Sequence, residues 1–142
     1  MGNDAPMDQT SITGISHVAL TARDLDRSAA WYGDVLGFRP LMPNDTTDFR
    51  RLILMHPSGA VVGLTQHAGS AAREFDPTIT GLDHLAFGLS TREELDEWAG
   101  RLDAAGVAHS GVQESPATGS ALLAFRDPDG IQLELYVQVD QP

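Results

Sequence analysis

The stretch that decides the fold is Asp127-Pro128-Asp129-Gly130-Ile131-Gln132-Leu133-Glu134-Leu135, near the C-terminus of a chain of 142 residues. Its first four residues predict a tight turn, because proline presets φ and Gly130 accepts the positive φ that closes the reversal. The alternation that follows predicts a strand with one apolar and one polar face. Glu134 stands on the polar face among apolar neighbours. It is either a solvated surface residue or a metal ligand.

An earlier part of the chain has the same pattern. The segment His56-Pro57-Ser58-Gly59-Ala60-Val61-Val62-Gly63-Leu64 aligns with the deciding stretch. Ile15-Ser16-His17-Val18-Ala19-Leu20 likewise aligns with Leu82-Asp83-His84-Leu85-Ala86-Phe87. Two copies indicate one duplicated supersecondary unit rather than a solenoid. Because each copy is too small to cover its own sheet face, the two must pair, within one chain or across a dimer.

Each copy also contains one helix with recognisable ends. The first helix is predicted to start after Asp24 as N-cap and to stop at Gly37, a favourable C′ residue. The second is predicted to open with the capping box Thr91-Arg92-Glu93-Glu94 and to stop at Gly106. The order of elements is therefore βαβββ, a linker, and βαβββ again.

These signals set the expected boundaries along the chain. Residues 1–12 are predicted to be a disordered leader, because they are polar and show no periodicity. The first module is expected at 13–67, a linker rich in Gly, Ala, Ser and Pro at 68–80, and the second module at 81–139. The predicted strands span residues 15–21, 38–42, 49–55, 60–66, 82–89, 107–113, 121–125 and 131–139.

Composition excludes several classes of function. A net charge of −11 argues against nucleic acid as a partner, because the chain lacks the basic surface that nucleic acids require. The absence of cysteine excludes disulfides, thiolate catalysis and cysteine-bound metal. No apolar run is long enough to span a membrane, and the N-terminus does not have the form of a signal peptide. We therefore expect a cytoplasmic protein with neither nucleic acid nor membrane as a partner.

Superposing the two copies places four positions in equivalent pairs, His17 with His84 and Gly63 with Glu134. A single strand histidine is more often an ordinary polar residue than a ligand. Here two histidines occupy matched places, and a carboxylate stands where the symmetry of the repeat requires one. Two histidines and one carboxylate suit a divalent ion such as Fe, Mn, Zn or Ni and leave positions for water or substrate. The repeat therefore favours a metal site made by His17, His84 and Glu134.

The quoted segments, together with Trp31-Tyr32-Gly33-Asp34-Val35-Leu36-Gly37-Phe38, resemble the vicinal oxygen chelate superfamily. That superfamily includes glyoxalase I, bleomycin-resistance proteins, fosfomycin-resistance transferases, methylmalonyl-CoA epimerase and extradiol dioxygenases. The resemblance covers about residues 13–139. It implies an α+β fold in which two paired βαβββ modules form a cup-shaped half-barrel sheet with the helices outside. It also implies a homodimer and a divalent metal bound by His17, His84 and Glu134.

Departures from the family pattern bear on the reaction. Glyoxalase I and related isomerases usually carry a fourth ligand, often Glu, where this chain has Gly63. The second module contains no lysine, which argues against the fosfomycin transferases. Ala124 stands where the extradiol dioxygenases have a tyrosine, although the spacing from Asp127 to Glu134 fits their signature. The metal triad argues against the bleomycin-binding members.

The resemblance thus implies a metal-dependent lyase, isomerase or dioxygenase that chelates a small oxygenated substrate on the ion. The alternative is a metal-free protein of the bleomycin-resistance type that binds or sequesters a small molecule. The residues expected to act on the substrate or to surround it are the catalytic Glu134 and Tyr136, and the binding residues Arg51, Thr65, His67 and Gln132.

Overall fold

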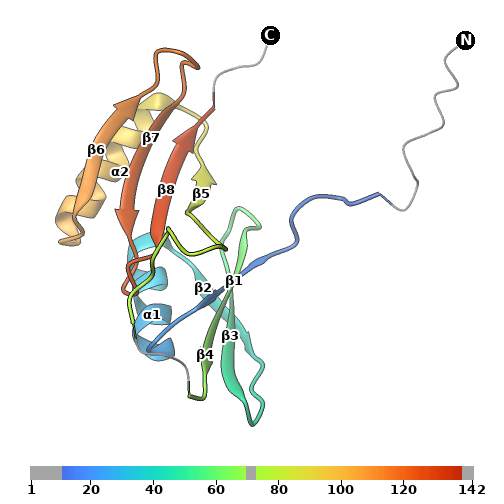
Figure 1. The fold of residues 1–142 in the computed structure, drawn as a ribbon. Coiled ribbons are helices and arrows are strands. Elements are labelled where there is room, and N and C mark those ends of the chain that lie inside the picture. The colour runs from blue at the N-terminus through green and yellow to red at the C-terminus, as the bar shows by residue number, and fades with distance from the viewer. Residues whose placement is uncertain (1–10, 70–72, 139–142) are drawn as a thin grey trace, which may run out of the picture.

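The computed structural model of the chain describes residues 11–69 and 73–138. Figure 1 shows two βαβββ modules, each a curved sheet with a helix on one face. The first module contains β1 (Val18–Thr21), α1 (Leu25–Trp31), the π-helical turn η1 (Tyr32–Leu36), β2 (Arg39–Pro43), β3 (Phe49–Met55) and β4 (Val61–His67). The second contains β5 (Leu85–Gly88), α2 (Arg92–Ala104), β6 (His109–Glu114), β7 (Ala121–Arg126) and β8 (Gln132–Val137).

The two sheets have the same topology. The strand orders are β1-β4-β3-β2 and β5-β8-β7-β6, so β1 and β5 lie at corresponding edges. In each sheet the edge strand is parallel to the last strand of its module, and the other pairs are antiparallel. Both sheets are open. The predicted α+β fold of two βαβββ modules is thereby confirmed.

The register of the two sheets is also the same. Ala19 pairs with Gly63 in the first sheet, and Ala86 pairs with Glu134 in the second. Gly63 and Glu134 are therefore equivalent in three dimensions, as their alignment in the sequence predicts.

Both helices begin and end where local signals predict. The Asp24 side chain accepts a 3.1 Å hydrogen bond from the backbone N–H of Arg27, and Gly37 ends the helical segment at a φ of 84°. Thr91 and Glu94 form the reciprocal capping box of α2. The first helix differs from the predicted regular helix in its last turn, which widens into the π-helical η1.

The two edge strands begin later than expected. Residues 15–21 and 82–89 were the predicted limits, whereas β1 starts at Val18 and β5 at Leu85. The partner strands explain the difference, because β4 starts only at Val61 and β8 only at Gln132. Before these residues both partners are still in their turns and offer no extended backbone to pair with. His17 and His84 consequently lie just outside their strands.

Most other strand limits differ from expectation by one or two residues, and β3 spans the predicted 49–55. Residues 73–80 of the expected linker contain turns and no helix or strand. Residues 70–72, most of the expected leader and residue 139 lie outside the described residues. No helix in the described part of the chain is long and apolar enough to cross a membrane.

One apolar core joins the two modules. Its buried residues come from the helix-facing side of both sheets and include Leu54 and Leu64 from the first module and Leu123 and Leu133 from the second. Aromatic contacts cross the junction: the ring centroids of Phe38 and Phe87 are 5.6 Å apart, and those of Trp31 and Phe125 are 6.2 Å apart.

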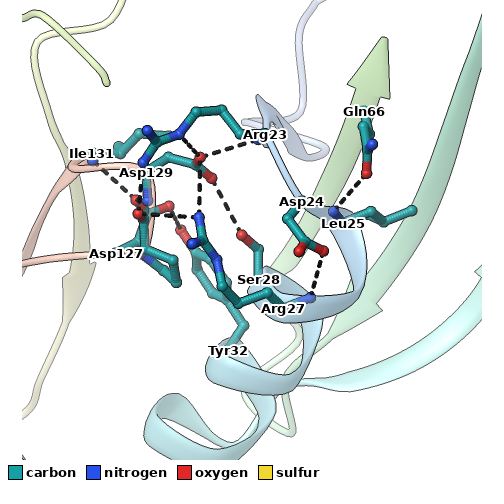
Figure 2. A network of polar contacts seen from close by, with 11 residues as sticks. Arg23, Asp24, Leu25, Arg27, Ser28, Tyr32, Gln66, Asp127, Asp129 and Ile131 are labelled. Atoms are coloured by element: carbon teal, nitrogen blue, oxygen red, sulfur yellow. Dashed lines mark hydrogen bonds and ion pairs between the residues drawn. The ribbon is translucent and has the colours of Figure 1, made fainter. Parts of the chain in front are cut away.

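A buried polar network reinforces the junction (Figure 2). Asp129 Oδ1 accepts hydrogen bonds from the backbone N–H of Arg23 at 3.0 Å and from its Nε at 2.9 Å. The Ser28 hydroxyl donates to the other oxygen of Asp129 at 3.2 Å, and the Tyr32 hydroxyl donates to Asp127 Oδ2 at 2.8 Å. The turn that precedes β8 is therefore anchored to the first helix of the other module.

Candidate functional site

The second module brings two of the predicted metal ligands together. His84 Nε2 lies 3.3 Å from Glu134 Oε2. The sheet register produces this contact, because Glu134 pairs with Ala86 and His84 lies two residues earlier, on the same side of the sheet. The Glu134 residue is buried, with 8% of its surface exposed, although it lies on the polar face of β8. A buried carboxylate beside an imidazole nitrogen is a candidate ligand pair.

The orientation of His84 is set by its neighbour Asp83. His84 Nδ1 lies 2.7 Å from Asp83 Oδ1, so this nitrogen carries a proton and donates a hydrogen bond to the carboxylate, which can only accept one. The hydrogen bond with Asp83, and then the charge of Glu134, raise the pKa of His84 against the opposing effect of desolvation. A carboxylate on one imidazole nitrogen is the usual support of a metal-binding histidine. Neither the pattern of strands nor the repeat signals this role for Asp83.

The arrangement of acceptors fits a cation. With Nδ1 protonated, a neutral His84 directs the lone pair of Nε2 at the negative oxygen of Glu134. Two acceptors facing each other at 3.3 Å repel unless a proton or a metal ion lies between them. The chemistry of these donors, one imidazole nitrogen and one carboxylate oxygen, therefore suits a divalent ion.

The third predicted ligand lies elsewhere. His17 is exposed in the segment before β1, and its Nδ1 is 3.0 Å from the hydroxyl oxygen of Ser16. Over residues 11–69 and 73–138, no three His, Cys, Asp or Glu side chains come close enough to hold a metal. One chain thus brings His84 and Glu134 together and keeps His17 apart.

Two other predicted residues share the Glu134 side of β8. Gln132 Nε2 donates a 3.3 Å hydrogen bond to Glu134 Oε1, the oxygen that does not face His84. Gln132 therefore contacts the carboxylate itself and helps to orient it. Tyr136 is half-buried two residues further along the strand, opposite Gly88.

The remaining predicted residues form a cluster on the first sheet. Arg51 Nε donates a 2.8 Å hydrogen bond to Oγ1 of the buried Thr65. The Arg51 guanidinium lies 4.3 Å from the centroid of the Phe49 ring, and that ring is 5.9 Å from the imidazole of His67. These contacts fix a cation on the same face of the sheet as Gly63, because Thr65 and Gly63 alternate with the apolar residues that face α1. Phe49, which supports the guanidinium, was not among the predicted residues.

Two βαβββ modules, each with a histidine just before its first strand, and a glutamate on the last strand of the second module define a recognisable class of protein. A family model described as the Glyoxalase/Bleomycin resistance protein/Dioxygenase superfamily matches residues 14–135. The chain belongs to this superfamily, which confirms the resemblance seen in its sequence motifs.

Individual relatives show how far the similarity extends. The crystal structure of a glyoxylase/bleomycin resistance protein/dioxygenase domain from Frankia sp. EAN1pec superposes with a TM-score of 0.84 at 38% identity, covering 91% of this chain and 100% of that one. The catechol-2,3-dioxygenase of Bacillus subtilis is 32% identical over 138 residues, which are 92% of this chain and 42% of that protein. The probable lactoylglutathione lyase of Vibrio cholerae is 29% identical over 85% of this chain and 88% of its own length. The similarity therefore extends to relatives with different reactions.

Proposed function

We propose that the protein is a metal-dependent enzyme whose site combines His84 and Glu134 of one chain with His17 of a second copy. The observation that carries the proposal is the 3.3 Å contact between His84 and Glu134, beside which one chain supplies no third ligand among its described residues. Two protein ligands alone bind a divalent ion weakly. A third protein ligand completes a common set that leaves open positions for substrate.

The free edges of the sheets support a second copy as the source of His17. β1 and β5 are both edge strands, so within the described residues each has backbone groups along one side that no other strand pairs. His17 and His84 precede these two edges. Ile15, beside His17, is 86% exposed, and a second copy placed against β1 would cover it. Because a two-fold dimer repeats each contact, it would form two identical sites.

The residues around the proposed site have separable roles. An ion bound there would act as a Lewis acid toward a substrate that chelates it through two oxygens. Gln132 holds one oxygen of Glu134 and leaves the other facing His84. Tyr136, on the same face, provides a phenol that can give or take a proton at the substrate.

The first sheet of the second copy, the copy that supplies His17, forms the other wall of the proposed site. Arg51 is held by Thr65 and by the ring of Phe49, so its guanidinium is ordered before any substrate arrives. We assign it to an anionic or carbonyl oxygen of the substrate, with His67 at the end of the same cluster. The substrate is thus a small oxygenated compound, and the reaction is that of a lyase, an isomerase or a dioxygenase.

Mixing two inactive variants tests both the ligands and the use of two chains. His17→Ala and Glu134→Ala should each remove tight binding of Mn(II) or Zn(II). After the two variants are mixed, unfolded and refolded together, half of the dimers are mixed, and one of the two sites in each is intact. We expect about a quarter of the wild-type metal content, which follows from the symmetry of the dimer. Mixing His84→Ala with Glu134→Ala is the matched control and should restore nothing, because both ligands come from the same module.

Each outcome separates the alternatives. Restoration only in the first mixture supports a site made by two chains. No restoration in either mixture, with metal bound by the wild type, means that the three ligands meet within one chain. A wild-type protein that binds no divalent ion at all supports the second candidate, a metal-free protein that binds a small molecule.

A further inference from the structure

We propose a second binding site, on the side of the sheets opposite Glu134, for a small molecule with an apolar aromatic part and an anionic group. The groove lies between η1 and β2 of the first module and α2 and β5 of the second. Leu135 and Phe87 line it, and these residues alternate with Glu134 and Ala86 along paired strands, so they face the other way. The site is independent of the proposed metal centre.

The apolar end of the groove is a cavity of about 140 Å³ at the module junction. Three aromatic rings line it, those of Phe38, Phe87 and Trp98, together with leucines from both modules. The Phe38 and Phe87 centroids are 5.6 Å apart. An engineered apolar cavity of about 150 Å³ in another protein stays dry and admits benzene. The cavity here therefore has the size and lining for one aromatic ring.

The open end of the groove is cationic. It has a volume of about 680 Å³ and shares Leu36, His56 and Trp98 with the apolar cavity, so the two adjoin. Arg39 and Arg101 line it, and Asp34 is the one carboxylate among its lining residues. The chain as a whole has 20 acidic and 9 basic residues, so this part of the surface reverses the overall balance of charge.

The two arginines are available to a ligand. Within the described residues neither Arg39 nor Arg101 forms an ion pair, whereas Arg23, Arg50 and Arg92 each do. The Arg101 guanidinium lies 5.0 Å from the centroid of the Trp98 ring, which places a cation beside a residue that lines both the apolar cavity and the cationic end. Charge-assisted hydrogen bonds from a guanidinium are the usual means of binding a carboxylate.

His56 adds a neutral donor between the two ends. Its Nδ1 accepts a 3.0 Å hydrogen bond from the backbone N–H of Ser58 and lies 2.8 Å from the hydroxyl of the same residue. Because a backbone N–H can only donate, Nδ1 is the unprotonated nitrogen and Nε2 carries the proton. The ring nitrogen that faces away from the turn is therefore a hydrogen-bond donor. Two guanidiniums and one imidazole N–H beside an aromatic cavity suit a carboxylate that is joined to an aromatic ring by a short chain.

Titration of the full-length protein with 4-phenylbutyrate tests this site, with the neutral 4-phenylbutan-1-ol as its matched ligand. The chain has two tryptophans, so the indole N–H signals in ¹H–¹⁵N spectra report the location. We expect the Trp98 signal to shift and the Trp31 signal to stay. Arg101→Gln and Arg39→Gln should each weaken phenylbutyrate binding about tenfold, the loss expected for one charge-assisted hydrogen bond. Binding of the alcohol should change little.

Two controls make the test decisive. Arg92→Gln removes the same charge from the same helix, at an arginine paired with Glu114, and should leave binding unchanged. Glu134→Ala should also leave it unchanged, whether or not the protein binds metal. The proposal is overturned if phenylbutyrate shifts neither indole or Trp31 alone, if Arg92→Gln weakens binding as much as Arg101→Gln, or if Glu134→Ala abolishes it.

Discussion

The Tyr32 hydroxyl donates a 2.8 Å hydrogen bond to Asp127 Oδ2 across 95 positions of sequence. Both residues are buried, and they belong to different modules. Asp127 also accepts 2.9 Å hydrogen bonds from the backbone N–H groups of Asp129 and Ile131. Burial raises the pKa of Asp127, while these three hydrogen bonds act in the opposite direction. The contact fixes the turn before β8, and with it the start of the strand that carries Glu134.

Tyr32→Phe should therefore destabilise the protein. The change keeps the ring and leaves Asp127 Oδ2 buried without its hydroxyl donor. We expect a loss of about 1–3 kcal/mol in the free energy of unfolding, the usual cost of an unsatisfied buried group. Urea denaturation at neutral pH measures it. Tyr136→Phe is the matched control, because the hydroxyl of this half-buried tyrosine forms no hydrogen bond within the described residues, and it should change stability by less than about 0.5 kcal/mol. Equal effects of the two substitutions would contradict the role given to Tyr32.

The same tyrosine should make stability fall in alkaline solution. Burial, followed by the charge of Asp127, raises the pKa of Tyr32 well above the ordinary value for tyrosine, about 10. The unfolded chain then loses this proton near pH 10 while the folded chain keeps it. The stabilisation is present below pH 10 and is lost as the pH rises above it, at up to about 1.4 kcal/mol per pH unit. Denaturation between pH 8 and pH 11.5 should show a shallower decline for Tyr32→Phe than for the wild type. Parallel curves would show that Tyr32 does not remain protonated through burial.

Local signals in the sequence predict much of the fold because the interactions they describe are local. The Asp24 cap, the Thr91 capping box and the turn that ends at Gly130 each depend on a few adjacent residues. The starts of the edge strands do not depend on adjacent residues. β1 and β5 begin where their partners leave a turn, so Val18 and Leu85 are determined by residues about 45 positions away, as the pairing of Val18 with Val62 and of Leu85 with Leu133 shows.

The candidate site likewise has one part that the sequence predicts and one part that depends on contacts between distant residues. The contact between His84 and Glu134 can be expected from the repeat, because matched strands impose a matched register. The separation of His17 from this pair reflects how the two modules pack, and the buried network of Arg23, Tyr32 and the two aspartates of the turn is one set of contacts between the modules. Those contacts join residues about 100 positions apart without any periodic pattern, so only the folded chain reveals them.

Asp83→Asn should lower metal affinity without removing a proposed ligand. Asp83 orients the imidazole of His84 through a 2.7 Å hydrogen bond, and loss of such a partner typically costs about 10–100-fold in metal affinity. Titration with Mn(II) or Zn(II), read by calorimetry, measures the change. Asp103→Asn is the matched control, because Asp103 is a similarly exposed carboxylate 2.8 Å from the imidazole of His109. If both substitutions have the same effect, His84 is not held as a ligand by its neighbour.

Gly63→Glu should add a fourth ligand to the proposed site. Gly63 occupies the place in the first sheet that Glu134 occupies in the second, and in the proposed dimer it accompanies His17. A Cβ atom at this position would lie 3.5 Å from the Ala19 Cβ and 3.7 Å from the Ile53 Cδ1, which are ordinary contacts, so the variant should fold. A second carboxylate should raise the affinity for Mn(II) or Zn(II) by about tenfold or more, since both ions accept a negatively charged carboxylate oxygen as a ligand. Gly63→Gln has nearly the same shape without the charge and should not produce this gain. An affinity for Gly63→Glu no higher than that for Gly63→Gln would mean that position 63 does not face the metal.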